Sequence, residues 1–246
     1  MKYMGSKNRI AKHILPIILK DRKENQHYIE PFVGGANMID KVSGLRIGAD
    51  INKYLIAMFQ GLQEDRELIF DIPKTLYDKC RSEYNNKTTN NFDLFTIAWI
   101  GYMGSANGRF YEGGYSGVSR TKIGTERNYI KESINNILKQ KTLLKDIKFI
   151  QSSYENLQIP NNSIIYCDIP YISTKQYSFS KDFDYDKFWQ WCREKAKQGH
   201  QIFISEYNAP DDFECLWQQE VKSSLSANGI AGGNKVSVEK LFTYRG

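Results

Sequence analysis

The chain has 246 residues, 41% of them hydrophobic and 25% charged, which is enough apolar material for a large folded domain and excludes a wholly disordered chain. No apolar run approaches the ~18 residues that a membrane span needs, and no signal-peptide core is present, so we expect a cytoplasmic protein without a membrane partner. The net charge of +6 permits a polyanionic partner without requiring one.

The N-terminal region predicts alternating strands and helices. Residues 8–20 carry apolar side chains at helical spacing, with Pro16 as an interruption. Residues 27–39, HYIEPFVGGANMI, predict a strand, a glycine turn and the start of a helix, and residues 45–56, LRIGADINKYLI, repeat that order. Two such units indicate an α/β domain with a mostly parallel sheet.

The middle of the chain has a different pattern. Residues 61–144 are mainly helical, except for GSANGRFYEGGYSGVSRTKIGTERN at 104–128, which predicts an exposed loop or hairpin with too little apolar material for a core. The strand and helix pattern returns after residue 145, with a final pair of strands around a glycine-rich turn. We therefore expect one α/β domain formed by residues 1–60 and 145–246, interrupted by an inserted, mostly helical domain at 61–144.

Two features of the first units are candidates for ligand binding. Gly34 in the glycine turn lets the backbone approach a ligand closely, although a tight turn alone would also require glycine. Asp50 follows the next strand, where a Rossmann-like site places the acid that binds ribose hydroxyls. The alternative for Asp50 is the N-cap of the following helix.

The segment SIIYCDIPY, residues 163–171, ends an apolar strand with a carboxylate. An ionised Asp168 needs an exposed position or a partner, and Pro170 keeps Ile169 extended. The Asp168 carboxylate and the Ile169 carbonyl then form two acceptors beside the ring of Tyr171. This set suits an exocyclic amino group on a flipped, planar base. A proline turn that merely ends the strand is the alternative.

The cysteines do not indicate a metal site. Cys80, Cys167, Cys192 and Cys215 are scattered, and only three histidines are present. Structural zinc sites use clustered Cys and His ligands. We therefore expect reduced thiols and no metal.

Taken in order, these motifs resemble those of the Dam-type (D12 class, alpha group) DNA adenine N6-methyltransferases. The matching segments are EPFVGGANM, GADIN and YCDIPY, preceded by KYMGSKNR and followed by IFISEYN and the final strands with a Ser-x-Ser-x-Asn-Gly turn. The resemblance implies a Rossmann-like methyltransferase sheet. It also implies that the 61–144 insert is a target-recognition domain.

The resemblance further implies an S-adenosyl-L-methionine site and a set of residues that form it. Tyr3 and Lys7 would border the cofactor, Phe32 and Gly34 would shape the turn under its methionine portion, Asp50 would bind the ribose, and Asp168 would touch cofactor and base. The chain departs from the family pattern at Ala36, where the last glycine is usual, and at Ile169, where the first proline is usual. A position that acts through its backbone carbonyl tolerates isoleucine.

The implied partner is double-stranded DNA, which would place the protein at the nucleoid. Basic and aromatic side chains in the insert suit groove reading, because arginine binds guanine edges and phosphates. The candidates are Arg109, Tyr115, Arg120 and Lys122. A solvated loop is the alternative. The sequence predicts neither the recognition sequence nor the oligomeric state, and it does not separate a restriction–modification enzyme from a phage enzyme or a solitary regulator.

The implied mechanism is direct transfer to the N6 amino group of adenine, without a metal or a covalent intermediate. The two acceptors would favour a tetrahedral nitrogen with its lone pair aimed at the methyl donor, and the Asp168 carboxylate would stabilise the growing positive charge. Cytosine N4-methylation uses the same acceptors and stays open. A silent DNA-binding relative and an enzyme with an RNA substrate stay open as well.

Overall fold

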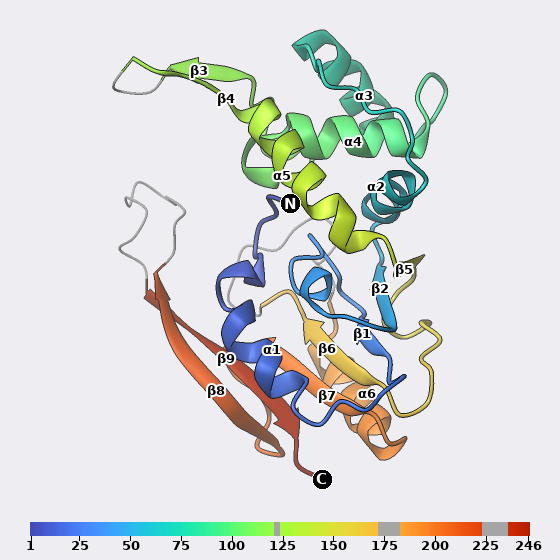
Figure 1. The fold of residues 1–246 in the computed structure, drawn as a ribbon, viewed down its shortest axis with the longest axis vertical. Helices are drawn as coiled ribbons and strands as arrows, with labels where there is room; N and C mark the ends of the chain where they lie inside the picture. The colour runs from blue at the N-terminus through green and yellow to red at the C-terminus, as the bar shows by residue number, and fades with distance from the viewer. Residues whose placement is uncertain (121–123, 172–182, 223–235) are drawn as a thin grey trace.

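The protein folds around a seven-stranded mixed sheet, in a computed structural model that describes residues 1–120, 124–171, 183–222 and 236–246 (Figure 1). The strand order is β5-β2-β1-β6-β7-β9-β8. Five strands are parallel: β1 (Tyr28–Glu30), β2 (Arg46–Asp50), β5 (Ile147–Gln151), β6 (Ile164–Asp168) and β7 (Gln201–Glu206). The predicted α/β class and mostly parallel sheet are confirmed.

The last two strands reverse direction. β9 (Val236–Tyr244) runs antiparallel to β7 with Glu206 opposite Lys240, and β8 (Phe213–Lys222) pairs with β9 at the edge of the sheet. Because β9 is antiparallel, its first residues lie at the edge where the parallel strands end. This reversal brings a late segment of the chain to the carboxyl ends of β6 and β7.

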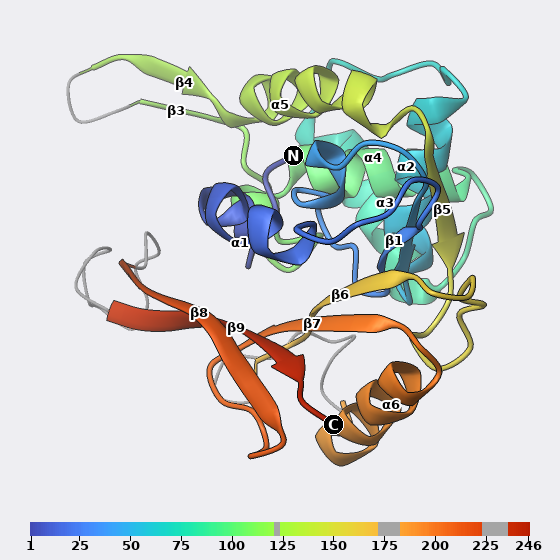
Figure 2. The same ribbon diagram turned by 60° about the horizontal axis from the view of Figure 1, so that its bottom comes forward.

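Helices cover both faces of the sheet. One face carries α1 (Ala11–Ile18) and α2 (Lys53–Gln63), and the other carries α6 (Tyr185–Lys197) (Figure 2). Short 3-10 turns, η1 (Lys7–Arg9) and η2 (Ile39–Lys41), flank the first units. The helix expected after the glycine turn is only η2. Pro16 lies inside α1 without ending it, because the buried side chains of Ile14, Leu15 and Ile18 outweigh one lost backbone hydrogen bond.

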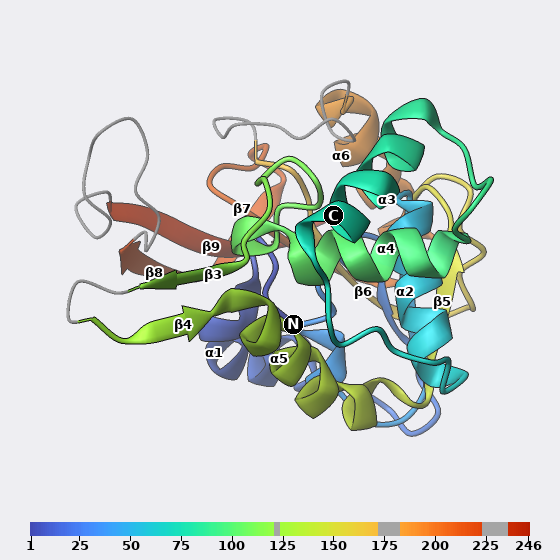
Figure 3. The ribbon, with the colours of Figure 1, turned by 90° about the horizontal axis from the view of Figure 1, so that it is seen from above.

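The insert consists of helices and one small hairpin. α4 (Leu94–Gly104) and α5 (Tyr129–Leu144) pack beside α2, α3 (Lys74–Asn86) packs on α4, and η3 (Ala106–Gly108) follows α4. β3 (Val118–Arg120) and β4 (Glu126–Asn128) form an antiparallel hairpin that extends away from the body (Figure 3). One hydrophobic cluster joins α1, α2, α4, α5 and the sheet, so the insert and the sheet share a core.

Part of the segment expected to be too polar for a core is buried. Phe110 and Tyr111 are almost fully buried, and the Phe110 ring stacks on Tyr102 with ring centroids 4.5 Å apart. Gly101 leaves space for these rings, since a Cβ there would lie 2.3 Å from Phe110. Aromatic residues of a polar-looking loop therefore fill the interior of the insert, while the hairpin extends from it.

Candidate active site

Acidic side chains gather where the parallel strands end. Glu30, Asp50, Asp168 and Glu206 are the last residues of β1, β2, β6 and β7. The carboxyl ends of parallel strands form one edge of a sheet, where open α/β folds bind their ligands. The candidate site residues from both ends of the chain therefore meet at this edge.

The glycine turn lies directly under Tyr3. Gly34 has φ +46°, a conformation that favours glycine, and a Cβ there would lie 2.9 Å from the Tyr3 ring. At Gly35 a Cβ would lie 2.6 Å from Tyr3 Cβ. The backbone N–H of Gly34 donates to Asp50 Oδ2 at 3.2 Å. The structure thus brings Tyr3, Gly34 and Asp50 together, and the two glycines are required by this close approach.

Ala36 takes the left-handed conformation that the usual glycine would adopt. Its φ is +54° and its methyl group is fully buried. A left-handed L-residue costs about 1–2 kcal/mol. Burying the methyl group recovers about 0.8 kcal/mol, and avoiding the backbone freedom of glycine recovers about 0.5–1 kcal/mol. These contributions roughly cancel, so the chain accommodates alanine without opening the turn.

Asp50 is not the cap of the helix that follows it. Asn52 caps α2, because its side chain accepts from the backbone N–H groups of Tyr54 and Leu55. Asp50 Oδ1 accepts from Asn52 N at 2.9 Å. Backbone N–H groups, that of Ile51 among them, thus orient the Asp50 carboxylate, which has about four lone-pair positions and keeps capacity for a ligand. Burial raises the pKa of Asp50 to about 6, against the opposing effect of these hydrogen bonds.

Asp168 is paired with a buried lysine. Lys7 Nζ lies 2.8 Å from Asp168 Oδ1 and also donates to Gly5 O at 3.3 Å. Burial raises the pKa of Asp168, and Lys7 opposes this shift without reversing it. Burial disfavours the charge on Lys7, but Asp168 and Glu239 outweigh it and raise the pKa of the ammonium. The carboxylate at the end of β6 is thus fixed by an ion pair with a buried ammonium.

The other residues of the motif support Asp168. Ile169 is buried in the cluster under α6, so isoleucine at this position serves packing. The carbonyl of Pro170 accepts from Tyr185 OH at 2.8 Å. The Tyr171 ring is 7% exposed, packs edge-on against Tyr207 and has Lys7 Nζ 4.5 Å from its centroid.

Phe32, at the start of the glycine turn, packs in an aromatic cluster. Its ring centroid lies 5.4 Å from Tyr154, 5.8 Å from Phe183 and 5.9 Å from Phe188. Phe32 therefore fixes the start of the glycine turn against α6.

Three residues near the site were not predicted from the sequence. Glu239 of β9 accepts from Tyr171 OH at 2.7 Å. Glu30 is buried, accepts from Tyr28 OH at 2.9 Å, and burial raises its pKa well above its usual range. Ile51 follows Asp50 and is 55% exposed. An apolar residue directly after Asp50 was the one signal available in the sequence.

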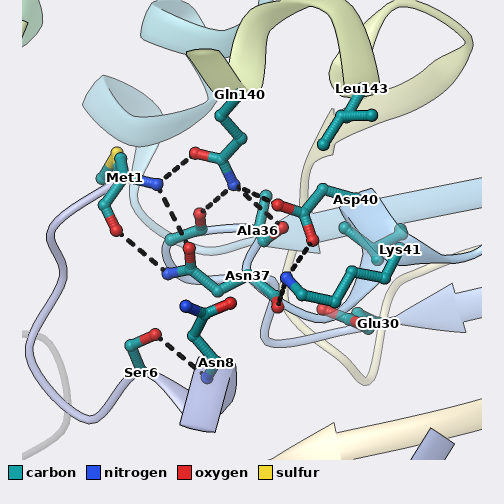
Figure 4. A network of polar contacts seen from close by, with 12 residues as sticks. Met1, Ser6, Asn8, Glu30, Ala36, Asn37, Asp40, Lys41, Gln140 and Leu143 are labelled. Carbon is teal, nitrogen blue, oxygen red and sulfur yellow. Dashed lines mark hydrogen bonds and ion pairs between the residues drawn. The ribbon is translucent and has the colours of Figure 1, made fainter. Parts of the chain in front are cut away.

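A polar network fixes the glycine turn from the insert (Figure 4). The Gln140 amide of α5 donates to the carbonyls of Gly35 and Ala36, both at 3.1 Å, and to Asp40 Oδ2 at 2.8 Å. The amide oxygen of Gln140 accepts from the Met1 amino group, which also donates to Asn37. The last helix of the insert therefore holds the turn directly.

The candidate DNA-facing residues differ in their surroundings. Arg120 is exposed on the β3–β4 hairpin. Arg109 is half-buried beside Phe110, and among the described residues its buried Nε has no hydrogen-bond partner. Tyr115 faces inward, since its hydroxyl donates to Ile72 O at 2.7 Å and its ring packs on Tyr77. Lys122 lies outside the described residues, as does the Ser-x-Ser-x-Asn-Gly turn.

The residues at this edge fit the cofactor implied by the motifs. Asp50 keeps carboxylate lone pairs for hydroxyl donors, and the close approach of Tyr3 to Gly34 and Gly35 places an aromatic ring beside the Gly34 amide that Asp50 binds. In the described part of the chain, no group of His, Cys, Asp and Glu side chains is arranged to hold a metal ion. Within the same residues, no helix has the length and apolar character to cross a membrane.

Comparison with known proteins gives two findings. The family model for D12 class N6 adenine-specific DNA methyltransferases matches residues 3–212. Type II methyltransferase M.FokI of Planomicrobium okeanokoites is 26% identical over 198 residues, which are 71% of this chain and 29% of that protein. The chain thus matches less than a third of that relative's length. The family match includes the glycine turn, Asp50 and Asp168, and it ends before β8.

Proposed function

Because the chain belongs to the D12 class of N6 adenine-specific DNA methyltransferases, we propose that it transfers a methyl group from S-adenosyl-L-methionine to the N6 amino group of an adenine flipped out of duplex DNA. The observation that carries this proposal is the position of Asp168, at the end of β6 and beside Tyr171. The relation to M.FokI supports a DNA substrate. Such a substrate would place the protein at the nucleoid of its host.

The chemistry of the proposed reaction rests on Asp168. The adenine amino nitrogen is a poor nucleophile, because its lone pair is delocalised into the ring. Hydrogen bonds from that amino group to the Asp168 carboxylate and the Ile169 carbonyl would favour a tetrahedral nitrogen. The nitrogen gains positive charge during transfer, and an anion fixed beside it stabilises the transition state. The surplus proton then leaves to water.

The cofactor would lie between the glycine turn and Asp50. When bound, S-adenosylmethionine supplies an activated methyl group on a sulfonium. The Asp50 carboxylate would accept from the ribose hydroxyls, and Gly34 and Tyr3 would border the methionine portion. Ile51, exposed next to Asp50, would give the adenine moiety an apolar surface.

Entry of the target base requires a change at Lys7. The Lys7 ammonium lies over the Tyr171 ring and is bonded to Asp168. A base can contact both Tyr171 and Asp168 only when this ammonium moves aside. The four-carbon side chain of lysine permits a shift without backbone movement.

The insert would select the DNA. The exposed β3–β4 hairpin with Arg120 suits a groove, where arginine can form two hydrogen bonds to guanine. Arg109 and Lys122 are proposed as further contacts. We propose that Tyr115 supports this loop through its hydrogen bond to the Ile72 carbonyl.

The experiment that tests the function is methylation of mixed-sequence duplex DNA with methyl-labelled S-adenosylmethionine, followed by mass spectrometry of the nucleosides. We expect label in N6-methyldeoxyadenosine. Asp168→Ala should reduce transfer by about 10²–10³-fold, because a fixed charge beside the reacting atom is lost. Thermal unfolding of the variant checks that it folds, since Lys7 then keeps only Glu239, 3.9 Å away, as a carboxylate partner.

The same experiment separates the competing functions. Label in N4-methylcytosine would identify the cytosine enzyme, which uses the same acceptors. A parallel reaction with RNA tests the RNA alternative, and label in RNA but not in DNA would identify an RNA methyltransferase. Binding of DNA without transfer, by a folded protein, would identify a silent relative.

A further inference from the structure

Glu239 is a second carboxylate within reach of the Lys7 ammonium. Its Oε2 lies 3.9 Å from Lys7 Nζ, whereas Asp168 Oδ1 lies 2.8 Å from the same atom. The two carboxylates therefore share one cation. Lys7 is bonded to Asp168 in this structure and needs to move only about 1 Å toward Glu239 to form the alternative charge-assisted hydrogen bond.

The fold keeps the Glu239 carboxylate in this position. Glu239 lies in β9, one residue before Lys240, which pairs with Glu206 at the end of β7. Its side chain is 16% exposed and accepts from Tyr171 OH at 2.7 Å through the same oxygen that faces Lys7. That hydrogen bond orients the carboxylate toward the cation, and it links β9 to the residue that follows Pro170.

Stability alone does not account for a carboxylate here. A buried polar contact adds little net free energy of folding, and apolar residues often replace buried ion pairs without loss. The arrangement has a clear use at a reacting centre, however. Lys7 must leave the face of the Tyr171 ring before a base can stack there, and a buried ammonium without a partner is costly.

We propose that Glu239 is a positioning residue that receives the Lys7 ammonium when the target adenine binds, and so clears the Tyr171 ring and Asp168 Oδ1 for the base. This inference rests on the proposed function. Lys7 then shifts between two carboxylates and is not left unpaired at any stage. Tyr171 is held in place throughout by its bond to Glu239. No covalent bond changes in this step.

The test compares single-turnover methyl transfer and S-adenosylmethionine affinity for the parent and Glu239→Gln. Glutamine keeps an oxygen that accepts from Tyr171 OH but loses the charge that Lys7 needs. We expect the transfer rate to fall by about tenfold or more, as for the loss of a charged hydrogen-bond partner. Cofactor affinity should change by less than about threefold, since Asp50 and the glycine turn are untouched.

A double-mutant cycle with Lys7→Met separates this role from a structural one. If Glu239 acts through Lys7, Glu239→Gln should cause no further loss in the Lys7→Met background. Glu220→Gln is the matched control, because it removes an exposed carboxylate from the neighbouring strand, and it should transfer like the parent. Thermal unfolding of each variant checks the fold.

Three results would overturn the inference. Losses that multiply in the cycle would mean that Glu239 does not act through Lys7. An unchanged rate in Glu239→Gln would mean that its charge has no part in transfer. A lower transfer rate that comes with a clearly lower melting temperature of the Glu239→Gln variant would indicate a structural role. An inactive parent protein, by contrast, would overturn the proposed function itself.

Discussion

Asp50 and Asp168 occupy equivalent positions at the ends of parallel strands, yet their surroundings give them different chemistry. Asp50 accepts from the backbone N–H groups of Gly34 and Asn52, which fix its orientation and leave it able to bind neutral hydroxyl donors. Asp168 faces the ammonium of Lys7, which favours the charged form of the carboxylate at the end of β6. Burial raises the pKa of both carboxyl groups.

The first prediction concerns the pH dependence of cofactor binding. Burial raises the pKa of Asp50 to about 6, so Asp50 is ionised at pH 7.5 and protonated at pH 5. Ribose hydroxyls donate to the ionised form, and therefore the affinity for S-adenosylmethionine should fall as the pH falls through about 6. Well below that pH the loss should approach about tenfold per unit, because one proton must leave on binding. Isothermal titration calorimetry at several pH values measures this slope.

Asp50→Asn is the control for this prediction. The variant should bind more weakly at pH 7.5 by about 1.5–3 kcal/mol, since a charged acceptor is lost. Its affinity should then stay nearly constant as the pH is lowered. A parent protein that binds equally well at pH 5 and pH 7.5 would show that Asp50 does not hold the ribose as an ionised carboxylate.

At the scale of the elements, α5 joins the insert to the cofactor side of the sheet. Gln140 is 5% exposed and bonds two carbonyls of the glycine turn together with Asp40. At the end of the same helix, Gln63 of α2 donates to the carbonyls of Leu144 and Ile147 at 2.7 and 2.8 Å. Two glutamines thus fix α5 in similar ways, but only Gln140 touches the turn.

This pair gives the second prediction. Gln140→Leu leaves buried acceptors unpaired, and it should lower stability by about 1–3 kcal/mol. It should also weaken S-adenosylmethionine binding by about tenfold, because a loosened glycine turn must be ordered on binding. Gln63→Leu should lower the melting temperature without changing cofactor affinity. Calorimetric unfolding and cofactor titration of both variants measure the two effects, and equal affinities for the two variants would contradict the prediction.

The elements also show what the sequence could and could not predict. β6 was predictable because an apolar run ends in Asp168, and the sheet class followed from two repeated strand, turn and helix units. The position of Glu239 was not predictable, because the antiparallel pairing of β9 with β7 brings Glu239 toward Asp168 only in the folded structure. The sequence left Asp50 open as the cap of α2, and the structure gives that role to Asn52, a residue that also favours caps.

The loop after α4 differs from its prediction for a related reason. Its glycines and polar residues suggest exposure, yet Gly101 of α4 leaves the space into which Phe110 and Tyr111 pack, and Gly108 of the loop lies against the backbone of Lys2. Glycine lowers the apparent hydrophobicity of a segment while it permits tight packing. Composition alone does not separate these two uses. Arg109 lies in the buried part, and its replacement is therefore expected to affect stability as well as DNA binding.

For the whole molecule, two hairpins project on the same side of the body. β3–β4 extends from the insert and β8–β9 from the edge of the sheet (Figures 1 and 2). The rest of the insert shares one hydrophobic cluster with the sheet. We therefore expect the β3–β4 hairpin to tolerate substitutions that would destabilise α3, α4 and α5. Substitutions in this hairpin can then change the DNA preference without changing the stability of the fold.

The last prediction uses two arginines of this hairpin. Arg120 pairs across the strands with Glu126, and Arg127 pairs with Ser119, so the two guanidinium groups start from opposite faces. Arg127 is already engaged, because it donates to both Glu132 oxygens at 2.5 and 2.9 Å and lies over the Tyr129 ring. Arg120 has no such bond among the described residues. We expect Arg120 to read a base edge and Arg127 to hold the base of the hairpin.

Binding of Arg120→Ala and Arg127→Ala to cognate and scrambled duplexes, at two salt concentrations, tests this assignment. Both variants lose one positive charge, so a difference between them reflects position. Arg120→Ala should weaken cognate binding by about 1–3 kcal/mol and relax the preference at one base pair, whereas Arg127→Ala should keep the preference. If Arg120→Ala instead weakens both duplexes equally and lowers the salt slope by about 1, Arg120 binds phosphate. If both variants bind like the parent, the hairpin is a solvated loop and the bases are read from elsewhere on this side.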